Sequence, residues 1–209
     1  MKALLLKDFF SMKSQIKWIC FIVLTVIGMS FFIEDGMILL AITLIFGTIQ
    51  ITSIFAFDEM SGWDQYANTL PFRKSQIIKS KYIFSLLLTV VLLLLVYPFV
   101  VFSNTVTNSF QMNELLSIIC SVVSLSMVLL SFIIPSFIKF GTQKARIVLF
   151  ILVFSLSYGT KYLLDIISLP SLPSVETLQR MSYVSPIFAL IILTMSYLLS
   201  VKFYEAKEF

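Results

Sequence analysis

Six long apolar runs, separated by short polar segments, dominate the chain. The runs cover residues 18–33, 37–57, 82–102, 115–134, 147–164 and 183–201. A bilayer core of about 30 Å needs about 20 apolar helical residues to cross it. Most of the runs approach that length, and the first and fifth are the shortest. The pattern predicts an all-α integral membrane protein with six transmembrane helices in a single domain, residues 1–209.

Composition agrees with this interpretation and excludes several classes of protein. Of the 209 residues, 59% are hydrophobic and 12% are charged, whereas soluble domains carry about 25% charged residues. Histidine is absent, and with it the commonest general base and metal ligand. Cys20 and Cys120 lie inside apolar runs, which favours small buried hydrophobic residues over a disulfide or a zinc site. We therefore expect no catalytic residue, no metal and no cofactor.

Basic residues are concentrated in alternate polar segments. Thirteen of the fifteen lie on one side of the predicted membrane: Lys2, Lys7, Lys13, Lys17, Arg73, Lys74, Lys79, Lys81, Lys139, Lys144, Arg146, Lys202 and Lys207. The opposite side carries mainly acidic residues: Glu34, Asp35, Glu114, Asp165 and Glu176. Because Lys and Arg are retained on the cytoplasmic side, both termini are expected in the cytoplasm. The net charge of +4 then needs no nucleic acid as a partner.

The N-terminal segment, residues 1–13, precedes the first apolar run. Leu4, Leu5, Phe9 and Met12 share one helical face, which predicts an amphipathic helix in the inner headgroup layer; a frayed extension of the first span is the alternative. The segment could also begin a cleaved signal peptide ending near Gly28. The apolar run continues past that point, which favours a retained helix.

The spans contain little that could drive transport. No acidic residue lies within a span interior, although ion-coupled transporters place charges there. Lys161 lies near an outer end, where it can anchor the helix beside Asp165. None of the six glycines begins a phosphate-binding loop. Either the protein is passive, or a separate protein supplies the energy.

The longest inner loop, residues 58–80, contains a helical pattern. Trp63, Tyr66, Ala67 and Leu70 recur at i, i+3, i+4 and i+7. The spacing predicts a helix over 61–70, with Ser61 as its N-cap and Pro71 ending it. A further helix is predicted to run from Arg73-Lys74-Ser75 into the third span. The aromatic face could anchor at the membrane surface or dock into a partner, and pattern alone favours the anchor.

This loop resembles a known signature. The acidic pair after the second span, then Gly62-Trp63, Tyr66, Leu70-Pro71 and Arg73-Lys74, resembles the coupling loop of small permease subunits of bacterial ABC exporters of the second type. The resemblance implies that residues 61–70 form a coupling helix seated on a separately encoded ATPase subunit. The coupling residues it implies are Asp58, Glu59, Trp63, Asp64, Tyr66, Leu70 and Arg73.

The resemblance also implies the rest of the assembly. Two permease copies, or one copy and a sister permease, would lie in the bacterial inner membrane, surrounded by lipid, and would bind two ATPase subunits. Residues 1–13 would be the amphipathic elbow, and residues 165–182 would form short re-entrant helices; an 18-residue loop broken by prolines is the alternative. Permeases that resemble this chain include exporters of amphipathic peptides, so a hydrophobic or amphipathic cargo, such as a peptide, is expected.

Small polar residues form two stripes within the spans. One comprises Ser117, Cys120, Ser121, Ser124 and Ser131, and the other comprises Thr43, Gly47 and Gln50. Close helix packing is the favoured interpretation; a translocation path formed by Thr43, Gln50, Ser121 and Ser124 is the alternative. Pro98, Pro135 and Pro186 are expected to set kinks or helix boundaries near span ends.

Two hypotheses of different classes follow. The preferred one is an ABC exporter permease, energised by a separate ATPase and working as a homodimer or heterodimer. The alternative is a non-transporting immunity or assembly factor that binds a toxin or partner within the bilayer.

Overall fold

The computed structural model describes residues 2–29, 36–107, 112–167 and 175–207, and within these ranges it contains helices and no strand. The fold is therefore all-α, as predicted. Its helices are α1 (Lys2–Met12), η1 (Lys13–Gln15), α2 (Ile16–Met29), α3 (Gly36–Met60), α4 (Trp63–Thr69), α5 (Lys74–Thr107), α6 (Met112–Ile167) and α7 (Val175–Glu205).

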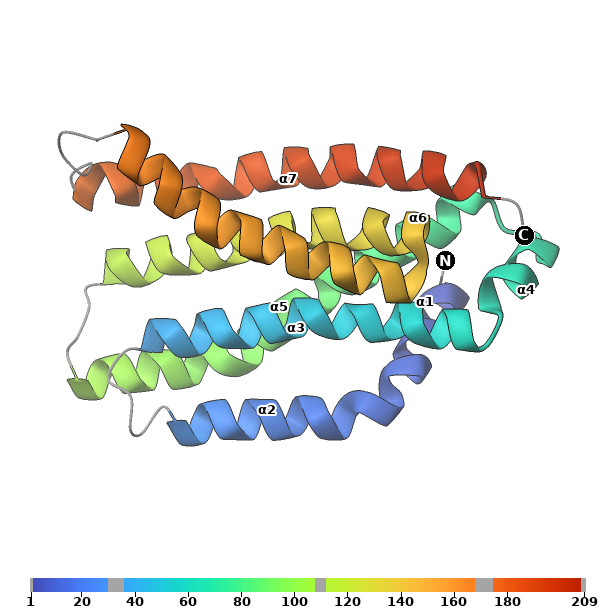
Figure 1. Ribbon diagram of the computed structural model, residues 1–209. Coiled ribbons are helices and arrows are strands. Elements are labelled where there is room, and N and C mark those ends of the chain that lie inside the picture. The colour runs from blue at the N-terminus through green and yellow to red at the C-terminus, as the bar shows by residue number, and fades with distance from the viewer. Residues whose placement is uncertain (1, 30–35, 108–111, 168–174, 208–209) are drawn as a thin grey trace.

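The long helices lie side by side, and the short ones gather at one end (Figure 1). Helix α4, helix α1 and the last turns of α7 all lie at that end, which we call the α4 end. Helix α1 meets α2 at a bend of 69°. The α4 end thus brings together segments from the start, middle and end of the chain.

Within the described ranges, four helices are long and apolar enough to cross a membrane: Leu40–Met60, Lys74–Phe102, Asn113–Ile151 and Gln179–Glu205. The bent pair of α1 and α2 adds a fifth if it counts as one span. The predicted fourth and fifth spans both fall within α6, on either side of Gly141. There the backbone leaves the helical region (φ 74°, ψ 173°), and the chain returns beside the first arm of α6 (Figure 1). The count of six spans stays a prediction, since residues 30–33 of the first one lie outside the described ranges.

The local predictions at the prolines, the outer segment and the cysteines had different outcomes. Pro98, Pro135 and Pro186 do not set helix boundaries, because α5, α6 and α7 continue through them; each proline removes a single backbone donor, and the rest of a long packed helix holds. Kinks at these prolines stay a prediction. Residues 175–182 form the start of α7, while the remainder of the predicted re-entrant segment is not fully described. The side chains of Lys161 and Asp165 also lie outside the description. Both cysteines are free thiols, and Cys20 is exposed rather than buried.

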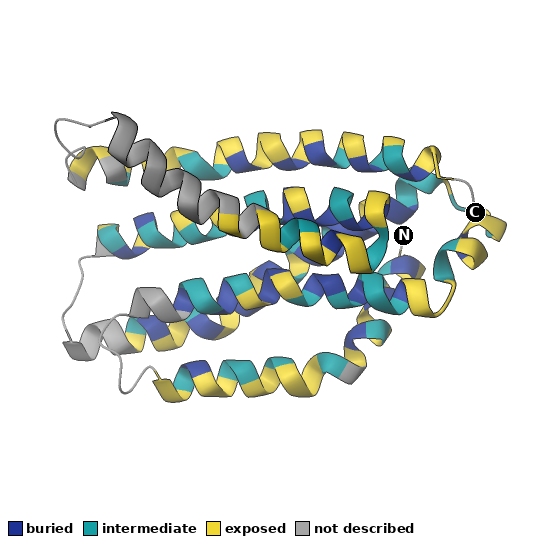
Figure 2. Cartoon of the chain, in the orientation of Figure 1, coloured by how far each residue is buried: buried dark blue, intermediate teal, exposed yellow. Residues whose placement is uncertain are grey.

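The core follows the contacts between long helices. One apolar cluster near the α4 end includes Ile51, Ala67 and Ile134; another, toward the opposite end, includes Val26, Leu44 and Leu92. Exposed positions recur along the outward faces of α2 and α7 (Figure 2), and these large apolar side chains suit contact with lipid. Charged contacts between helices, in contrast, occur at the α4 end.

Candidate functional site

Helix α4 is shorter than predicted at both ends. Its N-cap is Gly62 in a left-handed conformation (φ 64°, ψ 23°), without a side-chain capping bond. Ser61, the predicted cap, instead donates its hydroxyl to the Asp58 carbonyl oxygen at 3.3 Å. The reason is that the chain turns at the glycine, the residue that tolerates this conformation best. At the other end Leu70 is extended (φ −85°, ψ 154°), as expected for a residue before proline.

The predicted aromatic face of α4 is partly buried against its own chain and partly exposed. Ala67 is fully buried, and Trp63 packs on the same apolar cluster. The Lys7 ammonium lies 4.5 Å from the centre of the Trp63 ring, a cation–π contact. Tyr66, with its ring 5.7 Å from that of Trp63, remains 58% exposed. Trp63 therefore holds α4 on its own chain, and Tyr66 is the aromatic side chain left available.

Four charged side chains form a compact cluster beneath α4. It consists of Lys7 and Asp8 from α1, Asp58 from α3 and Lys81 from α5. Lys81 lies 2.9 Å from Asp8, Lys7 lies 3.1 Å from Asp8, and both lysines form ion pairs with Asp58. This charge cluster connects the N-terminal helix to the two helices that flank α4.

Burial makes the charge cluster sensitive to its composition. The side chains of Asp8, Asp58 and Lys81 are 1%, 6% and 6% exposed, and the opposite charges balance. One Asp8 carboxylate oxygen, Oδ2, is buried without a hydrogen-bond partner among the described atoms. Burial and the adjacent Lys81 charge lower the pKa of the Lys7 ammonium, although Asp58 and Asp8 oppose that shift. Removing one member of such a group leaves an uncompensated buried charge.

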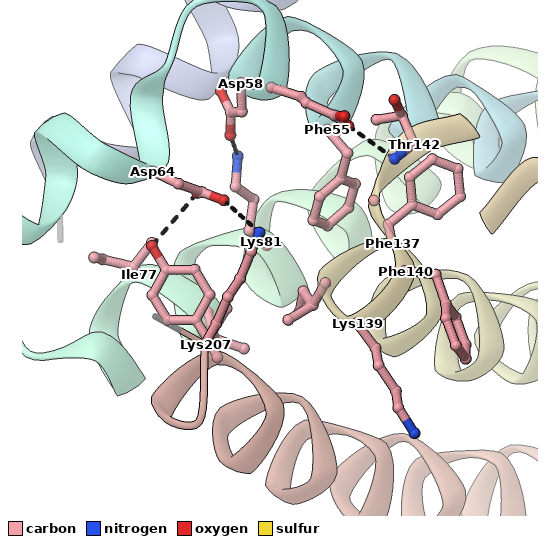
Figure 3. A pocket seen from close by; sticks show the side chains of 15 residues that line it. Phe55, Asp58, Asp64, Ile77, Lys81, Phe137, Lys139, Phe140, Thr142 and Lys207 are labelled. Carbon is pink, nitrogen blue, oxygen red and sulfur yellow. Dashed lines mark hydrogen bonds and ion pairs between the residues drawn. The ribbon is translucent and has the colours of Figure 1, made fainter. Parts of the chain in front are cut away.

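Further contacts join α4 and its neighbours to α6 and α7. Asp64 accepts hydrogen bonds from the Tyr204 hydroxyl and the Lys207 ammonium, each at 3.4 Å. Glu59 Oε2 accepts the backbone N–H of Thr142 at 2.8 Å, directly after the Gly141 turn. A cavity of about 320 Å³ lies among these groups (Figure 3), and its lining includes Asp58, Asp64 and Lys207. Helices α3 to α7 all contribute to it.

The structure gathers most of the expected coupling residues but separates the expected path residues. Asp58, Glu59, Trp63 and Asp64 make the contacts above, while Leu70 is half-buried and Arg73 is exposed just before α5. Thr43 and Gln50 line a small cavity among α2, α3 and α5. Ser121 and Ser124 line a groove of about 820 Å³ between α6 and α7. Within one copy of the chain, the four candidates do not form one path.

The charge cluster was not predicted from the sequence. The distribution of charge placed Lys7 and Lys81 only on the cytoplasmic side of the membrane, and it gave Asp8 no role. An adjacent Lys-Asp pair on a helix expected to lie against the membrane was the available signal. Among the described residues, no group of three acidic or thiol side chains could hold a metal ion.

Comparison with known families agrees with this architecture. The family model described as ABC-2 family transporter protein matches residues 3–205, which includes every helix above except the first residue of α1. No individual curated protein matches the chain. The match confirms the family resemblance that residues 58–80 indicated, and it covers nearly the whole chain. The chain therefore belongs to the ABC-2 transporter family, as a permease-type membrane component.

Proposed function

We propose that this chain is the membrane-spanning subunit of an ATP-driven exporter, with α4 as the coupling helix that docks on a separate ATPase subunit. One observation carries the proposal: α4 is linked to the rest of the chain on several sides, yet leaves Tyr66 58% exposed at its surface. Tyrosine is enriched among residues that dominate binding at interfaces. Tyr66 is thus suited to contact the ATPase, and the residues that link α4 to the rest of the chain are suited to transmit a movement of α4 to the other helices.

The proposed coupling residues divide into two roles. Tyr66 and Arg73, both exposed, contact the ATPase. Trp63, Asp64 and Leu70 fix α4 to its own chain, since each is partly buried. Asp58 and Glu59 carry displacement onward, because Asp58 belongs to the charge cluster and Glu59 contacts the turn of α6.

A movement of α4 would then reach every long helix beside it. A ligand shifts a two-state assembly only if it binds the two states with different affinities. ATP binding must therefore bring the ATPase to a form that prefers one position of α4. The ion pairs of the charge cluster would transmit this movement to α1, α3 and α5. The hydrogen bond of Glu59 would transmit it to the turn before the second arm of α6, and that of Asp64 to α7.

The remaining parts of the proposal concern the assembly and cargo. We infer six membrane crossings, with both termini and α4 on the cytoplasmic side of the bacterial inner membrane. Two copies, or one copy and a sister permease, enclose the path, to which Thr43, Gln50, Ser121 and Ser124 would contribute across subunits. An amphipathic or hydrophobic cargo, such as a peptide, suits spans with large exposed apolar surfaces.

Site-specific photocrosslinking tests the docking role. A photoreactive phenylalanine analogue at Tyr66 is expected to crosslink, in native membranes, to a protein that carries a phosphate-binding loop and hydrolyses ATP. The same analogue at Leu94, which is 63% exposed on α5, is the matched control and should crosslink no such protein. Tyr66→Ala should weaken binding of the ATPase about tenfold or more, as expected for a hot-spot side chain.

Two results would contradict the proposal. One is an ATPase that binds the Tyr66→Ala variant as tightly as the wild type. The other is a permease that co-purifies with a toxin or another membrane protein and with no nucleotide-binding subunit. That second result would favour the immunity or assembly factor.

A further inference from the structure

An apolar groove is lined by α3 and the two arms of α6. Its volume is about 510 Å³, and its walls include Ile45 and Ile49 from α3, Leu129 and Ile133 from the first arm of α6, and Leu149 from the second. Two threonines of α3 also face it, but each donates its hydroxyl to a carbonyl of its own helix at 2.7 Å. The walls therefore offer contact to hydrocarbon and little hydrogen bonding.

One cation lies in this otherwise apolar groove. Arg146 lines it and is exposed, and among the described side chains it has no ion pair. The charge of Arg146 acts on the Glu59 carboxylate. That carboxylate does not form an ion pair with Arg146 and accepts the Thr142 N–H instead. A guanidinium on a low-dielectric wall favours an anion with several oxygens, because it can donate more than one hydrogen bond to it.

The position of Arg146 sets the geometry of the occupant. It lies five residues after the Gly141 turn, hence about 7 Å into the bundle from the α4 end at 1.5 Å per helical residue. The α3 wall, from Thr52 to Ile45, extends about 10 Å along the helix, away from the α4 end. The groove thus has a cation at the end nearer α4, which we call its mouth, and apolar walls beyond it.

We infer that this groove binds an anionic phospholipid, with one acyl chain along α3 and the phosphate on Arg146. Anionic lipids are the anions present at the cytoplasmic face of a bilayer at high local concentration. Charge complementarity at the mouth and apolar contact along the walls match the two parts of such a molecule. The inference rests on the proposed cytoplasmic placement of the α4 end, but it is independent of the ATPase, because no residue of α4 lines the groove.

Lipid retention by the purified permease tests the headgroup contact. In native mass spectrometry, the protein in detergent is titrated with phosphatidylglycerol or with phosphatidylcholine of identical chains. The wild type should retain phosphatidylglycerol preferentially. Arg146→Gln should lower that retention about fivefold, to the phosphatidylcholine level, as expected for the loss of one cation at a membrane surface. Lys144→Gln, which removes an exposed cation outside the groove, should leave retention unchanged.

A second pair of variants tests the apolar wall. Ile49→Trp places a larger side chain at a position that is 49% exposed, and it should reduce retention of both lipids. Ile191→Trp makes the same change at a position 54% exposed on α7 and should retain them. Equal retention by Arg146→Gln and the wild type would overturn the proposal. An Ile49→Trp protein that becomes monomeric without losing lipid would also overturn it, because the groove would then be an interface between copies. Displacement of the lipid by an amphipathic peptide at a lower concentration would overturn it as well, because the groove would then be a cargo site.

Discussion

The α4 end and the membrane-embedded middle of the bundle are held together by different forces. At the α4 end, distant segments are joined by ion pairs, such as Lys81 with Asp8 and Lys207 with Asp64. Farther along the helices, hydroxyl groups of the described residues make polar contacts between them. Ser124 bonds to Ser185 at 2.8 Å, and Ser196 donates to the Ser131 carbonyl oxygen at 2.6 Å.

The difference matches what each region has to do. Hydroxyl bonds and close packing are short-range and individually weak, so many of them together define one arrangement of helices. Ion pairs in a low-dielectric setting are large individual terms, and their loss is costly. Lys7, 21% exposed, places one edge of the charge cluster near water. A few strong contacts at such an edge suit a junction that changes state as a unit.

The largest expected effect comes from breaking the charge cluster. Asp58→Asn removes the carboxylate that pairs with both Lys7 and Lys81 and leaves the buried group with an excess positive charge. We expect the free energy of unfolding to fall by about 3–5 kcal/mol, the range for an unpaired buried charge. Denaturation of the purified protein in mixed detergent micelles measures this.

An exposed ion pair in the same region, that of Asp64, provides the matched control for Asp58→Asn. Asp64 also pairs with a lysine, but the side chains of Asp64 and Lys207 are 34% and 41% exposed. Asp64→Asn should therefore change the free energy of unfolding by less than about 1 kcal/mol. Adding Lys7→Gln to Asp58→Asn restores charge balance and should recover part of the loss. Similar losses for the two single variants would show that burial does not distinguish these ion pairs.

An intermediate effect is expected where α3 and α5 approach within the bilayer. A Cβ atom on Gly47 would lie 2.2 Å from Leu92 Cδ1, and Leu92 is 4% exposed in the core. Gly47→Ala should therefore lower the free energy of unfolding by about 1–3 kcal/mol, as for other overpacked cores. Gly28→Ala is the control, since a Cβ there meets nothing within 4 Å. Equal stability of the two variants would mean that Leu92 can rotate away without loss.

The sequence predicted elements that depend on local pattern. The helical spacing of Trp63 and Ala67 located α4, and the basic segment before the third span correctly indicated that α5 begins near Lys74. The N-cap was wrong because the turn geometry depends on Gly62, one residue later than the side chain that resembled a cap. The small residue Gly47 lies where α3 and α5 approach closely, in agreement with the helix-packing interpretation of its stripe, whereas the role of Ser124 stays a prediction.

The charge cluster could not be predicted in the same way. Asp8 and Lys81 are 73 positions apart, and a charge next to an apolar run has the same pattern whether it faces water or another helix. Gly141 gave a similar difficulty. The apolar runs predicted a reversal of the chain between residues 134 and 147, but they did not show that the chain turns at this one glycine. Both features arise from contacts between segments, which periodicity along one segment does not contain.

The smallest expected effect tests the hydroxyl contacts themselves. The Tyr82 hydroxyl lies 2.7 Å from Ser196 Oγ and 2.8 Å from Ser200 Oγ, joining α5 to α7. Tyr82→Phe removes both bonds and retains the ring, which packs edge-on against Tyr197. We expect a loss of about 0.6 kcal/mol, and less than about 1.7 kcal/mol, in the free energy of unfolding, as measured for side-chain hydrogen bonds between membrane helices. A double-mutant cycle with Ser200→Ala isolates the Tyr82–Ser200 pair. A coupling energy as large as the loss expected for Asp58→Asn would contradict the distinction between weak hydroxyl contacts and strong buried ion pairs.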